Sequence, residues 1–229
     1  LSEAAQASLA EQIPIFEQRL VEEQIRAGRV KSPETRVTVI IGNPPYDRDT
    51  TGFSSTGRRK GGIVRHASES EGTALIADLL SRLDAQARAQ QALQLYNDYV
   101  YFWRWAIWKA TEQHENGTAI VSYVTASSYL TGNGFGGLRA LMRERFSDIW
   151  ITDLGGDGRG TDADENVFEG IRSPVAVAIC VRRSGTTSDT PATVRYRRLS
   201  GTRESKLQFL SSRHELDDLD SELAATEHD

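Results

Sequence analysis

The sequence predicts an α/β fold with an antiparallel β-hairpin at one edge of the sheet. Three observations predict it: segments with helical and strand patterns alternate, a β-branched apolar run stops at a glycine, and two strand-like runs close the patterned part. At 229 residues the chain can bury a substantial core. We expect a helical segment at residues 1–35, the α/β region at 36–200 and a polar tail at 201–229.

Composition excludes some classes of protein and indicates the compartment. The formal net charge of −5 does not mark a nucleic-acid binder, although a basic face is compatible with it. Cys180 is the single cysteine, so no internal disulfide can form, which fits a reducing cytoplasm. No signal peptide or apolar run of membrane-spanning length is present. The chain begins with Leu1 rather than Met, as expected for a piece of a longer protein.

The first predicted element is a helix over residues 2–28, whose apolar residues recur at helical spacing. Pro14 interrupts it and marks a kink or a second start. Ordinary packing is the expected role of its apolar face, and docking of a partner is the alternative.

The centre of the chain is a strand over residues 37–41 that ends at Gly42 and is followed by Asn43, Pro44, Pro45 and Tyr46. Proline has no N–H and fixes φ, and the residue before each proline is held extended. The tetrad is therefore a stiff lip at a strand end, the place where open α/β sheets bind ligands.

Such a lip suits methylation of an adenine amino group, which is a poor nucleophile because its lone pair is delocalised into the ring. Two fixed acceptors for the amino hydrogens would turn that lone pair toward a methyl donor. The Asn43 side-chain oxygen and the Pro44 carbonyl can supply them, and Tyr46 can stack on the extruded base. A proline-rich turn with a packed tyrosine is the structural alternative.

Residues 47–72 form a polar, glycine-rich loop that carries basic side chains, so it either contacts a DNA backbone or is simply solvated. The candidates for phosphate contact are Arg58, Arg59, Lys60 and Arg65.

Two helices are expected next, at residues 73–93 and 95–113. The second carries seven aromatic residues, for which packing against a sheet is favoured over base stacking because they cover most faces of the helix. A strand at 118–124 follows, and then Gly132–Gly137 matches G-x-G-x-x-G. A cofactor loop there is one alternative, but the glycines lie well past the strand end, so the start of a helix at 138–146 is favoured.

The carboxyl-terminal part of the α/β region contains an acidic, glycine-rich loop at residues 157–165. It lacks EF-hand spacing, so no metal site is expected. The predicted strands here are residues 148–154, 174–182 and 193–199, of which the last two form the hairpin through a turn at 184–191.

Several segments together resemble one enzyme family. Residues 39–46 (V-I-I-G-N-P-P-Y) are similar to motif IV of S-adenosylmethionine-dependent methyltransferases that modify N6 of adenine in DNA. Residues 95–106, 137–139 and 166–176 follow in the order seen in the methyltransferase part of single-chain type ISP restriction-modification enzymes. The resemblance covers about residues 36–183. It implies the carboxyl-terminal half of a Rossmann-like methyltransferase fold.

The resemblance also implies roles for individual residues. Phe168 would stack on the extruded adenine opposite Tyr46, the alternative being a core phenylalanine, and Arg172 would lie near the phosphates. S-adenosylmethionine is the implied cofactor, but its binding residues cannot be assigned. The family's cofactor half should precede motif IV, where this chain has only a helical pattern, so either that half lies upstream or a partner supplies it.

The predicted function is part of a DNA adenine N6-methyltransferase of a restriction-modification or phage-defence system, inactive as this chain alone. Its expected partners are double-stranded DNA, the cofactor half and a target-recognition region, which the tail could begin. Two alternatives remain: a methyltransferase acting on a protein glutamine amide, and a non-catalytic module that binds DNA or a partner.

Overall fold

A computed structural model describes residues 15–46, 61–67, 72–114, 117–156 and 164–213. The chain divides into two compact units, residues 1–37 and 38–229. The first unit contains helix α2 (Ile15–Lys31), which matches the second part of the helix predicted over residues 2–28. The rest of that prediction lies outside the described residues. Leu20 and Ile25 in α2 are about half exposed, at 49% and 52%, so the helix shows no buried apolar face there.

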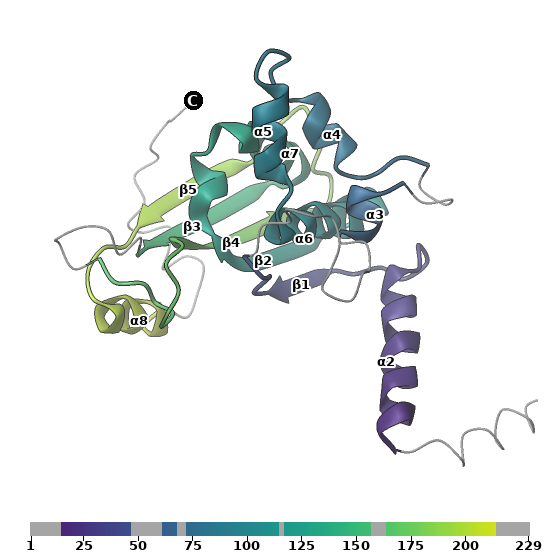
Figure 1. The fold of residues 1–229 in the computed structure, drawn as a ribbon, viewed down its shortest axis with the longest axis horizontal. Helices are drawn as coiled ribbons and strands as arrows, with labels where there is room; N and C mark the ends of the chain where they lie inside the picture. Colours follow the sequence, from purple (N-terminus) through teal and green to yellow (C-terminus); the bar gives the residue numbers. More distant parts are fainter. Residues whose placement is uncertain (1–14, 47–60, 68–71, 115–116, 157–163, 214–229) are drawn as a thin grey trace, which may run out of the picture. The chain divides into compact units, whose positions relative to one another are not determined.

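The second unit is built on a five-stranded mixed sheet, which confirms the predicted α/β class (Figure 1). The spatial order is β1-β2-β4-β3-β5. β1 pairs in parallel with β2 and β3 in parallel with β5, whereas β4 is antiparallel to both of its neighbours. The strands are β1 (Val39–Gly42), β2 (Ala119–Ala126), β3 (Asp148–Gly155), β4 (Val175–Arg182) and β5 (Thr193–Arg198).

The prediction that the last two strands form an antiparallel hairpin at one edge of the sheet is wrong. β5 does not pair with β4 but lies parallel to β3, with Asp148 opposite Thr193. The reason is that β2 and β3 occupy both edges of β4 over its whole length, so the chain must cross to the free edge of β3. Backbone hydrogen bonds guide this crossing: the N–H groups of Ala192 and Thr193 donate to the carbonyls of Arg143 and Ser147 at 2.8 and 2.9 Å.

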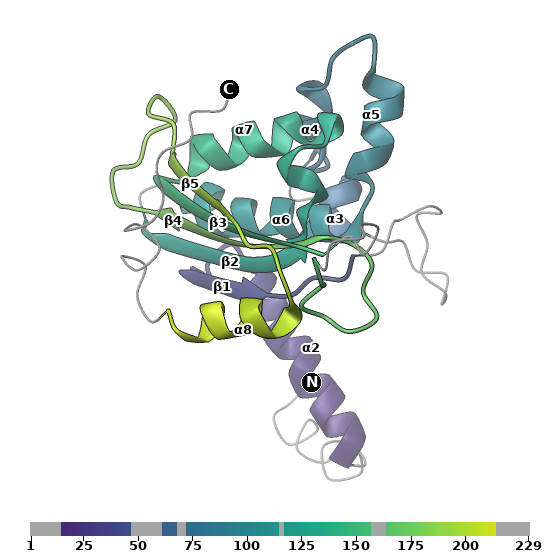
Figure 2. The same cartoon turned by 90° about the vertical axis from the view of Figure 1, so that its left-hand side faces the viewer.

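Helices cover the sheet unequally. One face carries α3 to α7, and the other carries α8 (Figure 2). The α-helices of this unit are α3 (Gly62–Arg65), α4 (Ala77–Ser81), α5 (Arg88–Leu95), α6 (Asp98–Ile107), α7 (Gly136–Arg145) and α8 (Arg203–Ser211). Short π- and 3-10 turns are η1 (Trp108–Glu112), η2 (Ser127–Leu130) and η3 (Asn133–Phe135). In the parts of the chain that the structure describes, no helix has the length and apolar character needed to cross a membrane.

The aromatic residues of α6 serve the core, as predicted. Trp103 and Tyr99 are 0% and 1% exposed. The Trp103 ring meets Tyr123 of β2 edge to face, with centroids 4.9 Å apart, a favourable geometry for aromatic pairs. These contacts fix α6 on β2.

The helix predicted over residues 73–93 is wrong as one element, because the chain turns between α4 and α5. The Asp84 carboxylate accepts the N–H of Gln86 at 2.7 Å, a local turn that competes with helix hydrogen bonds. The predicted loop at 47–72 likewise contains a short element, α3, which is anchored by buried Val64. The Ile76 N–H donates to the Val64 carbonyl at 2.8 Å.

The glycines of the G-x-G-x-x-G match serve close packing. The Gly134 N–H donates to the Gln94 side chain at 3.2 Å, and an added Cβ at Gly134 would lie 2.7 Å from the Gln91 carbonyl oxygen. Residues of α5 therefore lie directly against Gly134, and an added Cβ at Gly137 would lie 3.1 Å from the Leu79 carbonyl oxygen of α4, so neither glycine is open to a nucleotide. The predicted start of a helix is confirmed by α7, which begins at Gly136.

Candidate active site

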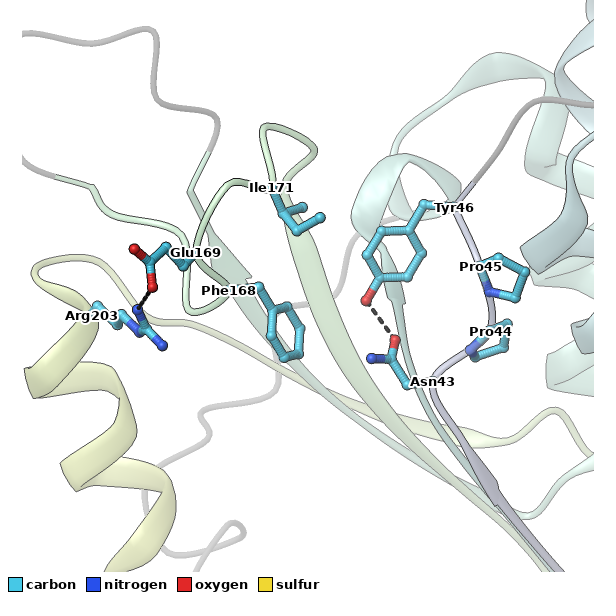
Figure 3. A pocket seen from close by; sticks show the side chains of 8 residues that line it. All are labelled: Asn43, Pro44, Pro45, Tyr46, Phe168, Glu169, Ile171 and Arg203. Carbon is cyan, nitrogen blue, oxygen red and sulfur yellow. Dashed lines mark hydrogen bonds and ion pairs between the residues drawn. The ribbon is translucent and has the colours of Figure 1, made fainter.

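A pocket of about 450 Å³ lies beyond the carboxyl end of β1 (Figure 3). Its volume falls in the range of roughly 300–1,000 Å³ that is common for small-molecule sites. It is lined by Asn43, Pro44, Pro45, Tyr46, Phe168, Glu169, Ile171 and Arg203.

The predicted lip forms one wall of this pocket. Gly42 lets β1 approach the core, because an added Cβ would lie 3.0 Å from the Tyr123 ring. Pro44 is buried, whereas Asn43 is exposed to the pocket. The Tyr46 O–H donates to the Asn43 Oδ1 at 2.7 Å. Burial raises the pKa of the Tyr46 phenol, so the phenol stays protonated and can keep donating near neutral pH. This bond fixes the orientation of the Asn43 amide.

The opposite wall comes from the loop between β3 and β4. Asn166 organises this loop: its Nδ2 donates to the carbonyls of Gly156 at 3.1 Å and Ser173 at 2.8 Å, and its Oδ1 accepts the N–H of Phe168 at 3.0 Å. One amide thus joins both ends of the loop to its middle. Phe168 projects from the loop toward the Asn43 and Tyr46 wall (Figure 3).

Tyr46 and Phe168 rest on the same small apolar cluster, made of Leu154, Val167 and Val175. The structure thus brings the predicted tetrad and Phe168 together around one pocket, although they are far apart in the sequence. The arrangement offers the Asn43 amide oxygen as an acceptor on one side and two aromatic rings on opposite walls. A flat heteroaromatic ring with an amino group suits both features.

Helix α8 supports the pocket wall that carries Phe168, which we call the Phe168 wall. Its presence shows that the prediction of only a polar tail after residue 200 is wrong. Lys206 in α8 is 1% exposed. Its ammonium donates to the Leu154 carbonyl at 2.6 Å, the Glu165 carbonyl at 2.7 Å and the Asp164 carboxylate at 2.5 Å. The buried lysine therefore joins α8 to the end of β3 and to the start of the Phe168 loop.

A sequence signal for α8 does exist. The Thr202 hydroxyl caps the helix by accepting the Ser205 N–H at 3.2 Å, and acidic Glu204 follows in the first turn. Threonine at the cap and an acidic residue in the first turn are typical of a helix start. The helix brings Arg203 into the pocket lining, which makes Arg203 a site residue that the sequence reasoning missed.

Of the predicted phosphate-binding residues, the two that the structure describes, Arg65 and Arg172, are not among those that line the pocket. Arg65, in α3, places its guanidinium 4.7 Å from the centroid of the Tyr96 ring, a cation–π contact that anchors α3. Arg172 is exposed beside Ile171. Three more candidates, Arg58, Arg59 and Lys60, lie outside the described residues.

Most of the acidic loop predicted at 157–165 also lies outside the described residues. Across the part of the chain that the structure describes, no group of three His, Cys, Asp or Glu side chains could hold a metal ion. Asp164, at the end of that loop, is engaged by Lys206.

We expect acid to weaken the Phe168 wall through Asp164. Burial alone would raise the pKa of this carboxyl. Hydrogen bonds from Lys206 and from the N–H groups of Gly156 and Gly201 lower the pKa by a larger amount, so the net shift is downward. A carboxyl with a lowered pKa stabilises the fold above its unfolded pKa, and this stabilisation disappears as the pH falls through the folded value. The melting temperature should therefore fall below about pH 4 more steeply in the unmodified protein than in Asp164→Asn. If the melting temperatures of the two proteins fall in parallel as the pH is lowered, Asp164 makes no such contribution to stability.

Comparison with protein-family models gives no match, and comparison with curated protein sequences gives none either. Among solved structures, the chain has the fold of a region of Type ISP restriction-modification enzymes, as the sequence resemblance predicted. One is a nuclease-deletion mutant of LlaGI in complex with a DNA substrate mimic, with 21% identity and a TM-score of 0.59 over 83% of this chain. Another is the ATP-dependent enzyme LlaBIII bound to DNA, with 22% identity and a TM-score of 0.61 over 89%.

A third similar structure is the DrdV–DNA complex, with 24% identity and a TM-score of 0.55 over 81% of this chain. The present chain spans only 17% of the LlaGI chain, 12% of LlaBIII and 17% of DrdV.

Proposed function

We propose that this chain contains the base-binding half of a DNA adenine N6-methyltransferase in a restriction-modification or phage-defence system. The observation that carries the proposal is the placement of Asn43 and Pro44 in one pocket with Tyr46 and Phe168. Two acceptors and two aromatic walls are the groups needed to hold an extruded adenine and orient its amino group.

In this proposal the residues act on the amino group of the base. Asn43 Oδ1 has two lone pairs, so it can accept one amino hydrogen while keeping its bond from the Tyr46 hydroxyl. The Pro44 carbonyl accepts the other amino hydrogen, and the nitrogen lone pair then points out of the ring plane. Methylation makes the amine cationic, after which its proton can leave without a general base. Tyr46 and Phe168 hold the ring still meanwhile.

The methyl group would come from S-adenosylmethionine, held outside the described part of this chain. The Gly132–Gly137 loop does not fit that cofactor, because Gly134 packs directly against α5 and Gly137 against the Leu79 carbonyl of α4. The outer edge of β1 offers a place for a cofactor half, since among the described residues β1 pairs only with β2. Val39 and Ile41 of β1 expose 51% and 77% of their surfaces. An unpaired edge with exposed apolar side chains is typical of an interaction surface.

Double-stranded DNA is the proposed substrate, and a target-recognition region elsewhere in the full-length protein would select the site. Among the residues outside the described ranges, Arg58, Arg59 and Lys60 remain candidates for phosphate contact. Methylation of a protein glutamine amide uses the same pair of acceptors, but the two aromatic walls favour a flat base over an aliphatic side chain.

The proposal is tested with the full-length protein, labelled S-adenosylmethionine and a DNA pool of mixed sequence. We expect label in DNA, and digestion to nucleosides followed by mass spectrometry should identify N6-methyladenine. Label in N4-methylcytosine would overturn the choice of adenine, and label in a protein glutamine would support the amide alternative. If no methyl group is transferred but the protein still binds DNA, the result would support the alternative of a non-catalytic DNA-binding module.

A further inference from the structure

We propose that Arg203 binds a phosphate of the nucleotide whose base enters the pocket, and that Glu169 holds the Arg203 guanidinium while the pocket is empty. The inference rests on the proposed function, because it names the group that recognises the backbone of the same nucleotide.

Arg203 and Glu169 are the charged residues among the eight that line the pocket. The Arg203 Nη1 lies 3.7 Å from Glu169 Oε2, and the pair is on the side of Phe168 away from Asn43 (Figure 3). In adenine, the amino group and the nitrogen that carries the sugar are at opposite ends of the ring system. The bond to the sugar lies in the plane of the ring, so a base whose amino group is at Asn43 and whose face stacks on Phe168 releases its sugar at the opposite edge of the ring. The phosphate beyond that sugar can then pass beside the Phe168 ring to Arg203, which lines the same pocket.

The ion pair between Arg203 and Glu169 is easily exchanged. The two side chains are 45% and 91% exposed, and exposed pairs of this kind contribute little to stability. A phosphate can accept two parallel hydrogen bonds from one guanidinium, which makes it a stronger partner. Glu169 then turns to solvent, and its negative charge no longer opposes the incoming backbone.

The backbone of Arg203 is fixed before any ligand arrives. The Arg203 N–H donates to Glu165 Oε2 at 2.7 Å. Three positions later in α8, buried Lys206 bonds to the same loop. A donor on a fixed helix turn loses less conformational entropy on binding than one on a free loop, which favours a specific contact.

Deoxyadenosine and deoxyadenosine 5′-monophosphate test the inference without knowledge of the DNA target. Both are titrated against the full-length protein by ligand-observed NMR at low salt. We expect the monophosphate to bind about tenfold tighter, and Arg203→Ala to abolish this preference while leaving deoxyadenosine affinity unchanged. Arg203→Lys should retain part of the preference, because lysine binds phosphate as a point charge. Glu169→Gln should raise affinity for the monophosphate alone, by about twofold.

Arg183→Ala is the matched control, since Arg183 is an exposed arginine that forms an ion pair with Asp148 at 2.9 Å, beyond the carboxyl end of β4 and at the opposite end of the strands from the pocket. It should retain the full preference for the monophosphate. If Arg203→Ala also retains it, the phosphate assignment is wrong while the base pocket stands. If neither ligand binds the unmodified protein, the base pocket of the proposed function fails, and the phosphate assignment fails with it.

Discussion

Replacing Asn43 by alanine is expected to lower the methyl-transfer rate of the full-length enzyme by about 100- to 1,000-fold, while base extrusion continues. The substitution removes an acceptor whose hydrogen bond strengthens as the amino group becomes tetrahedral, so the loss falls on the transition state rather than on DNA binding. Single-turnover kinetics measure the rate. A fluorescent adenine analogue at the target position measures extrusion, and its signal should be unchanged in Asn43→Ala.

Two substitutions of Tyr46 distinguish its stacking on the base from its positioning of the Asn43 amide. Tyr46→Ala removes a stacking face, worth about 1–3 kcal/mol per base in single-strand binders, so it should lower the extrusion signal, as should Phe168→Ala. Tyr46→Phe keeps the ring but loses the 2.7 Å bond to the Asn43 Oδ1, so it should keep the signal and lose about tenfold in rate. Methylation by Asn43→Ala at the unmodified rate would refute the role of the amide.

The strand and its lip could be predicted because their causes are local. A β-branched run favours a strand, and two consecutive prolines after Asn43 prevent a helix whatever surrounds them. Phe168 was different, since nothing local shows that it faces Tyr46. Only the family resemblance paired them, and the structure explains the pairing by the shared cluster under both rings.

Strand pairing could not be predicted, because it depends on which sheet edges are already occupied. The sequence of residues 174–199 reads as two strands joined by a turn, the usual pattern of a hairpin. Both edges of β4 are taken by β2 and β3, whose residues are distant in the chain, so β5 joins β3. Periodicity identifies strands but contains no information about this competition.

Helix α8 was missed because its most buried residue is a lysine. Apolar periodicity finds helices that bury an apolar face, whereas α8 is fixed by Lys206, which is 1% exposed and surrounded by oxygen acceptors. A lysine is almost never fully buried unless paired, so composition alone indicates a solvated tail.

Lys206→Met is expected to lower the free energy of unfolding by about 1–3 kcal/mol, since it removes the shared donor of three acceptors, although Asp164 keeps its ion pair with Arg198 at 3.4 Å. The carboxylate of Asp164 and the carbonyls of Leu154 and Glu165 would lose their shared donor while methionine still fills the space. Urea unfolding of the full-length protein measures the change. Leu207→Met, at an exposed neighbouring position of α8, is the control and should change the value by less than about 0.5 kcal/mol.

The same variant tests whether α8 holds the Phe168 wall. Under conditions where Lys206→Met stays folded, the extrusion signal of the adenine analogue should fall, because the loop that carries Phe168 has lost its bond from the buried ammonium. Adding Asp164→Asn removes a carboxylate that has lost one of its two cationic partners, Lys206, and keeps only Arg198. It should recover part of the stability, since residues in one network do not contribute additively. It should not recover the extrusion signal, because the carbonyl of Glu165 still has no donor from α8. A loss of stability below about 1 kcal/mol, with an unchanged extrusion signal, would show that Lys206 does not fasten the helix to the site.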